Sequence, residues 1–197
     1  MPIAVPHLDL THGQAAWILS HGESPSERTL DQLRYLRLLG VPFTTAERRR
    51  AAGNRLRYDY DHLLEAAVAL FALRRGYIPK DVAIYLIKHR QDLRQSSRQV
   101  LRDLPETALH QAWVKSRGKM ISVMRNEHFL RLHDRASDTP GIFELLGPQQ
   151  VRCLADSFGL HERYPGEEAR PLLPLTRVVL ESVAWAQDVP EIKPGPK

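Results

Sequence analysis

Cysteine is almost absent from this chain of 197 residues, which contains only Cys153. A single thiol excludes an intrachain disulfide, and it also excludes a zinc site built mainly from cysteines. We interpret Cys153 as a small buried apolar residue. Its isolation fits a reducing environment, so we expect a cytoplasmic location.

Long apolar runs are missing as well. The longest, residues 66–73, is far shorter than the ~18 residues of a membrane-spanning helix, and we interpret it as a buried helix face. The first residues, MPIAVPHLDLTHG, lack a basic segment followed by an apolar core, so we expect neither a signal peptide nor a membrane partner. With 43% hydrophobic and 26% charged residues, the composition is that of an ordinary globular protein.

Patterns typical of catalysis do not occur in the sequence. It has no glycine-rich phosphate loop, no nucleophile elbow and no recognisable pair of carboxylates. The nine histidines form neither an HxxxH nor an HExxH pattern. We therefore expect no enzyme, no metal and no cofactor. Trp113, Phe143 and Trp185 are interpreted as core residues rather than as the lining of a ligand pocket.

Positive charge is concentrated in one segment. Residues 26–57 contain eight arginines opposed only by Glu27, Asp31 and Glu47, which gives this segment a charge of +5, equal to that of the whole chain. A basic surface on an otherwise neutral body indicates docking on a polyanion. The arginines are Arg28, Arg34, Arg37, Arg48, Arg49, Arg50, Arg55 and Arg57.

Two helices are predicted in and before the basic segment. Thr11 is a suitable N-cap for a short first helix. The second helix covers about residues 27–39, where leucines recur at helical spacing, and Gly40 ends it. Either Ser24 or Ser26 can cap this second helix, and the sequence does not decide between them.

Residues 44–59 predict a basic hairpin. Residues 51–54 (Ala-Ala-Gly-Asn) are typical of a hairpin tip, and residues 55–58 alternate like a short strand. We expect Tyr58 to pack beneath this hairpin.

Two closing helices are predicted next. One begins at Asp59 or Asp61 and ends before Gly76. The other begins at Pro79, and its apolar positions are Val82, Ala83, Tyr85, Leu86 and Ile87.

The C-terminal half gives weaker signals. Residues 91–119 predict helix, interrupted at Pro105. Residues 120–134 are compatible with strand, a short helix is expected at about 149–158, and residues 172–185 fit a strand or a helix equally well.

Two segments resemble the MerR family of transcriptional regulators. Residues 32–43 (QLRYLRLLGVPF) are similar to the family's Leu-Arg-Tyr stretch, its glycine and the apolar exit into the wing. Residues 55–86 are similar to the family's Arg-x-Tyr-Asp wing end and the helices after it, with residues 76–78 as the turn between them. Residues 26–30 resemble the start of its recognition helix. The resemblance covers about residues 10–90.

This resemblance implies a winged helix-turn-helix that binds double-stranded DNA as a homodimer. Arg28, Thr29 and Gln32 are of the types suited to base edges in the major groove. Neutralising ~5 phosphates would make the logarithm of the binding constant fall with the logarithm of the salt concentration, with a slope near −4 to −5. Contacts to the DNA backbone or minor groove are expected from Arg34, Tyr35 and Arg37 on the helix and from Arg48, Arg49, Arg50, Asn54, Arg55 and Arg57 in the wing.

The predicted fold class is mainly α, with a MerR-like winged helix-turn-helix followed by a helical or α+β C-terminal region. The expected parts are residues 1–90 for DNA binding, 91–119 as a helical linker, 120–190 for dimerisation or sensing, and 191–197 as a disordered tail. The expected function is sequence-specific regulation of transcription, with any small-molecule effector unidentified. Two alternatives stay open: an architectural or excisionase-like DNA-binding protein, and a module that binds an acidic protein partner.

Overall fold

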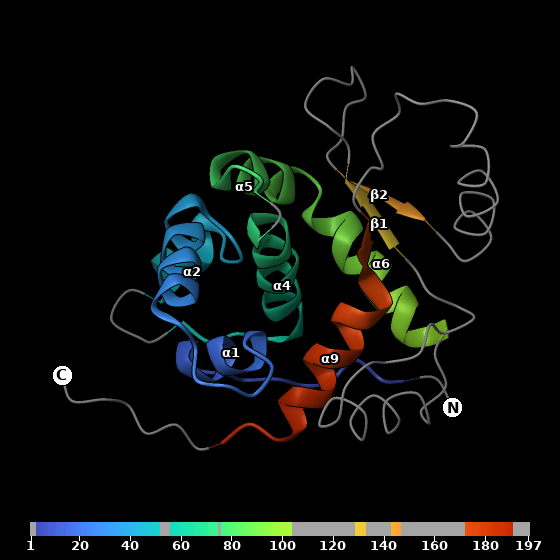
Figure 1. Cartoon of the computed structure of the whole chain (residues 1–197), viewed down its shortest axis with the longest axis horizontal. Helices are drawn as coiled ribbons and strands as arrows, with labels where there is room; N and C mark the ends of the chain where they lie inside the picture. The colour runs from blue at the N-terminus through green and yellow to red at the C-terminus, as the bar shows by residue number, and fades with distance from the viewer. Residues whose placement is uncertain are drawn as a thin grey trace.

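The computed structural model describes residues 3–51, 56–74, 76–103, 129–132, 143–146 and 172–190, and these are mainly helical (Figure 1). No helix in these ranges is long and apolar enough to cross a membrane. The helices are α1 (His12–Leu19), α2 (Glu27–Leu39), α3 (Thr45–Arg50), α4 (Tyr60–Arg74), α5 (Pro79–Lys88), α6 (Arg90–Asp103) and α9 (Leu175–Gln187). The strands are β1 (Phe129–Leu132), β2 (Phe143–Leu146) and β3 (Leu172–Pro174).

The predicted caps of α1 and α2 are confirmed. Thr11 and Gln14 form a capping box, in which the Thr11 hydroxyl accepts from the Gln14 amide at 3.2 Å and the Gln14 side chain accepts from the Thr11 amide at 2.9 Å. Ser26 rather than Ser24 caps α2, since its hydroxyl accepts from the Thr29 amide. Gly40, at φ 98°, ends α2 in the left-handed conformation that glycine adopts without a steric cost.

The first arm of the predicted hairpin is wrong, because residues 45–50 form α3. Thr44 and Glu47 make a second capping box: the Thr44 hydroxyl accepts from the Glu47 amide at 3.1 Å, and the Glu47 carboxylate accepts from the Thr44 amide at 2.6 Å. This local pattern starts a helix where the arginine content indicated a wing. Near the expected second arm, Tyr58 pairs with Leu10 in an isolated antiparallel bridge. Of the expected tip, Ala51 is the C-cap of α3, and residues 52–54 lie outside the described residues.

The two closing helices follow the prediction closely. Asp59 rather than Asp61 begins α4, because its carboxylate accepts from the His62 amide at 2.8 Å. Pro79 occupies the first turn of α5, as predicted. One expected apolar position of α5 is wrong: Ile87 is 46% exposed, whereas the other four expected positions are buried.

The C-terminal segment completes the core formed by the N-terminal helices. Residues 172–185, for which strand and helix were both open, form β3 followed by α9. α9 packs against α1, α4 and α6 (Figure 1), and its Leu175, Val179 and Val183 belong to the same buried cluster as the leucines of α2 and α4. β1 is the central strand of a sheet in the order β2-β1-β3, antiparallel to both neighbours. The expected break at Pro105 and the helix at about 149–158 lie outside the described residues.

Gly22 provides a stability test of the contact between α9 and the α1–α2 turn. Its φ is +79°, and an added Cβ would lie 2.3 Å from the ring of Trp185, which packs edge-on against Trp17. Gly76 is a matched control, since its φ is +86° and nothing lies within 4 Å of an added Cβ. We expect Gly76→Ala to cost about 1–2 kcal/mol for the backbone conformation alone. Gly22→Ala should cost a further ~1–3 kcal/mol from overpacking, measured by urea unfolding. Equal losses for the two variants would contradict the proposed clash.

Candidate nucleic-acid interface

The outer face of α2 is polar and accessible. Arg28, Asp31, Arg34 and Tyr35 are exposed along it. Arg34 donates to Asp31 at 2.9 Å, with both side chains more than half exposed. An ion pair this accessible to water contributes little and opens easily, so Arg34 stays available to an incoming anion.

Thr29, which we expected to contact bases, points into the protein. It is only 8% exposed, and its hydroxyl lies 3.0 Å from that of Ser26 in the cap of α2. Helical periodicity places Thr29 on the same side as Leu33 and Leu36, which are fully buried. The prediction that Thr29 contacts bases is therefore wrong, while Gln32, half-buried at the edge of the face, stays a candidate.

The arginines of α3 divide into two kinds. Arg49 and Arg50 are exposed. Arg48 instead turns back onto α2, where its Nη1 donates to the carbonyls of Arg37 and Leu38 at 3.2 and 3.3 Å. These carbonyls lie in the last turn of α2, where that of Arg37 also accepts from the Gly40 amide at 3.2 Å. The prediction of a free wing contact is therefore wrong for Arg48, which fixes α3 against the end of α2.

Arg57 is also engaged within the protein. Its Nε and Nη2 donate to the two carboxylate oxygens of Asp9 at 2.7 and 2.9 Å, a bidentate pair. The hydrogen bond from Arg57 holds the pKa of Asp9 below its ordinary value. The expected contact of Arg57 with DNA stays a prediction, and a phosphate there would have to displace the Asp9 carboxylate. Asn54 and Arg55 lie outside the described residues.

Tyr58 is buried, at 1% exposure, although the hairpin beneath which we expected it to pack is replaced in part by α3. Its ring packs edge-on against Phe43, and its hydroxyl lies 3.0 Å from Nδ1 of His12. Burial raises the pKa of Tyr58 to about 12, so the hydroxyl stays protonated at neutral pH. This contact joins the start of α1 to the segment that follows α3.

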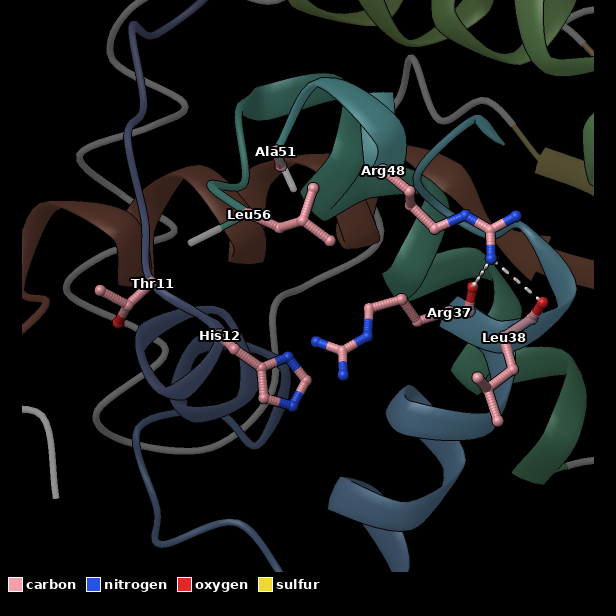
Figure 2. Close-up of a pocket in the computed structure, with 7 residues that line it drawn as sticks. All are labelled: Thr11, His12, Arg37, Leu38, Arg48, Ala51 and Leu56. Atoms are coloured by element: carbon pink, nitrogen blue, oxygen red, sulfur yellow. Dashed lines mark hydrogen bonds between the residues drawn. The ribbon is translucent and has the colours of Figure 1, made fainter. Parts of the chain in front are cut away.

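A pocket of about 590 Å³ opens where α1, α2 and α3 meet (Figure 2). The Arg37 side chain extends from α2 toward the ring of His12. Burial, and then the nearby charges of Arg37 and Arg34, lower the pKa of His12. The pocket is lined by Thr11, His12, Arg37, Leu38, Arg48, Ala51 and Leu56, and none of these residues is acidic.

A buried histidine connects α3 to α4. His62, 7% exposed, lies 2.8 Å from Asp59 and 3.3 Å from Glu47, measured from its ring nitrogens to their carboxylate oxygens. Burial alone would lower the pKa of His62, but the two carboxylates outweigh burial and raise it. Glu47 thus both caps α3 and pairs with α4.

The stability contributed by His62 should depend on pH. Because its folded-state pKa is raised above 6.5, the contribution is complete below 6.5 and is lost as the pH rises through the folded-state value. We expect the difference in unfolding free energy between the wild type and His62→Gln to be larger at about pH 5.5 than at about pH 8.5. Gln91→Ala, at an exposed position without a titratable group, is the control and should show no such trend. A His62→Gln penalty that grows with pH would contradict the assignment.

We found no match to this chain among protein-family models, curated proteins or solved structures. Among the described residues, no group of three or more His, Cys, Asp or Glu side chains is arranged to hold a metal ion.

Proposed function

We propose that the protein is a sequence-specific, double-stranded DNA-binding regulator of transcription that acts as a homodimer. The observation that carries the proposal is the set of exposed arginines on two helices that Arg48 joins: Arg28 and Arg34 on α2, and Arg49 and Arg50 on α3. The rest of the chain has balanced charge, so the net positive charge of the protein belongs to this segment.

The arrangement of α2 supports its proposed role as a recognition helix. A helix of 13 residues is about 20 Å long, and the major groove is wide enough to accept it. Leu33 and Leu36 fix the inner face of α2 in the core, where α2 packs against α1, α4 and α5. Its outer face, with Arg28 near the N-terminus, is left for base edges.

In this proposal α3 takes the place of the wing. The hydrogen bonds from Arg48 to the last carbonyls of α2 hold α3 beside the recognition helix. Arg49 and Arg50 then extend from the same rigid unit toward the DNA backbone, where they would set the position on the duplex without reading sequence. Dimerisation belongs to the proposal because one module of this size reads too few base pairs for useful specificity.

The first test compares binding to the gene's own upstream region with binding to a random duplex of equal length, by gel shift at two salt concentrations. Selective binding that weakens with salt supports a regulator. Equal binding to both duplexes would replace this proposal with an architectural role. The absence of binding to either would favour the acidic-partner alternative and overturn DNA binding.

Two arginine variants should separate base reading from backbone contact. Arg28→Ala is expected to cost about 1–3 kcal/mol on the specific site and little on random DNA. Arg49→Ala should weaken binding to all duplexes about equally and make the salt slope less steep by about 1. The control is Arg102→Gln, which removes an exposed arginine in the last turn of α6, a helix outside the proposed interface. Identical effects of Arg28→Ala on specific and random DNA would remove Arg28 from base readout.

A further inference from the structure

We infer that the pocket between α1, α2 and α3 is a binding site for a phosphate group. The inference goes beyond DNA binding, because it concerns a half-buried site that the exposed arginines do not form. It is argued from the charge of the pocket, its volume and the character of its walls.

The pocket carries two uncompensated positive charges. Arg37 and Arg48 both line it, and no carboxylate among the described residues forms an ion pair with either. Arg48 donates only to neutral oxygens, those of two carbonyls and the Thr45 hydroxyl. Elsewhere in the described structure, half-buried arginines are neutralised: Arg90 and Arg94 both pair with Glu65 at 2.8 Å. The Arg37 guanidinium is therefore the group free to bind a phosphate through paired hydrogen bonds, and the charge of Arg48, whose own hydrogen bonds go to α2 and Thr45, adds to the positive field in the pocket.

The pocket is larger than a phosphate group alone requires. A volume of about 590 Å³ lies within the range of ~300–1,000 Å³ typical of sites for small organic ligands. Leu38, Ala51 and Leu56 supply apolar groups to the lining, and Thr11 and His12 supply polar ones. Figure 2 shows Leu38 across the view from Ala51 and Leu56. This mixture suits a small molecule with an apolar part and one phosphate. A backbone phosphate of the duplex offers the same chemistry with a single charge.

His12 provides a reporter at the site. Its Nδ1 lies against the Tyr58 hydroxyl, and its Nε2 is buried without a hydrogen-bond partner. The Arg37 guanidinium lies in the direction of the ring (Figure 2). An anion bound to Arg37 would cancel part of the positive field on this imidazole, so the histidine ring resonances of the DNA-free protein should shift as the site fills.

The experiment titrates the full chain with phenyl phosphate in the absence of DNA. We expect a saturable change in the His12 ring resonances and a rise in the unfolding temperature. Potassium chloride at the same ionic strength should produce neither effect. Arg37→Gln should weaken binding at least about tenfold, as expected for loss of a charge-assisted pair, whereas Arg102→Gln on α6 should bind like the wild type.

The same binding with phenyl phosphate and with chloride, or an unchanged affinity in Arg37→Gln, would overturn the inference. If Arg37→Gln does not fold, Arg37→Lys keeps the charge but loses the paired hydrogen bonds, and it should still bind more weakly than the wild type. A wild-type affinity in Arg37→Lys would also count against the site.

A second arm adds duplex DNA and identifies the source of the phosphate. If the duplex displaces phenyl phosphate and produces the same His12 shift, the pocket holds a backbone phosphate. If both bind together, the pocket takes a free phosphorylated molecule. Because the first arm contains no DNA, failure of the phosphate site and failure of the DNA-binding proposal are distinguishable.

Discussion

A fourfold increase in salt concentration is expected to weaken duplex binding on the order of a hundredfold. The exposed arginines Arg28, Arg34, Arg49 and Arg50 are available to phosphates. Four contacts predict a log–log slope of about −3 to −4 for duplex DNA. This is less steep than the sequence alone predicts, because Arg57 is paired with Asp9 and Arg48 is held by the carbonyls of α2.

Fluorescence anisotropy with a labelled duplex, measured over a series of potassium chloride concentrations, gives this slope directly. Removing both Arg49 and Arg50 should make it less steep by about 2, since each phosphate contact contributes about 0.9. Arg102→Gln should leave it unchanged. A slope that does not respond to loss of Arg49 and Arg50 would place the interface somewhere other than α3.

Glu65→Ala is expected to lower the free energy of unfolding by about 3–5 kcal/mol. Glu65 is fully buried, and its two carboxylate oxygens accept from Arg90 at 2.8 Å and from Arg94 at 2.9 Å. Burial raises the pKa of this carboxyl, and the two arginines oppose the rise. Removing the carboxylate would leave Arg90 without a counter-charge and Arg94 with only the longer pair to Asp61 at 3.9 Å, and a half-buried charge of this kind is costly.

Removal of the Glu65 carboxylate should also affect the C-terminal end of α2. Arg90 donates through Nη2 to the carbonyl of Gly40 at 2.8 Å, so the same guanidinium that binds Glu65 holds the end of the proposed recognition helix. Urea unfolding measures the stability, with Glu23→Ala at an exposed position as a control that should change it by less than about 0.5 kcal/mol. A loss below about 1 kcal/mol for Glu65→Ala would show that water or rearrangement compensates the buried pair.

Signals contained within a few residues predicted the first half of the fold well. Ser26, the leucines of α2 and Gly40 define both ends of that helix, because caps and helical periodicity act between neighbours in the sequence. The hairpin prediction is wrong because it follows the run of arginines and ignores a local helix signal. That signal is the Thr44–Glu47 capping box, which begins α3.

The partners of the arginines could not be predicted. Arg48, Arg49 and Arg57 look equivalent in the sequence, yet one binds helix carbonyls, one is exposed and one pairs with a carboxylate 48 residues away. Such contacts depend on how the helices pack. The same is true of Glu65, which the sequence places only on a buried helix, and of the phosphate pocket, whose walls come from separate segments.

The position of α9 has a consequence for how the protein is made. About 70 residues of sequence separate α6 from α9, yet α9 packs against α1, α4 and α6 (Figure 1). During synthesis the ribosome releases the arginine-bearing helices first, before the helix that covers their core exists. The apolar surfaces of α1, α4 and α6 that contact α9 stay exposed until then, and a ribosome-associated chaperone is the cellular factor suited to protect them. Competence for its proposed nucleic-acid partner would then be acquired only after α9 emerges.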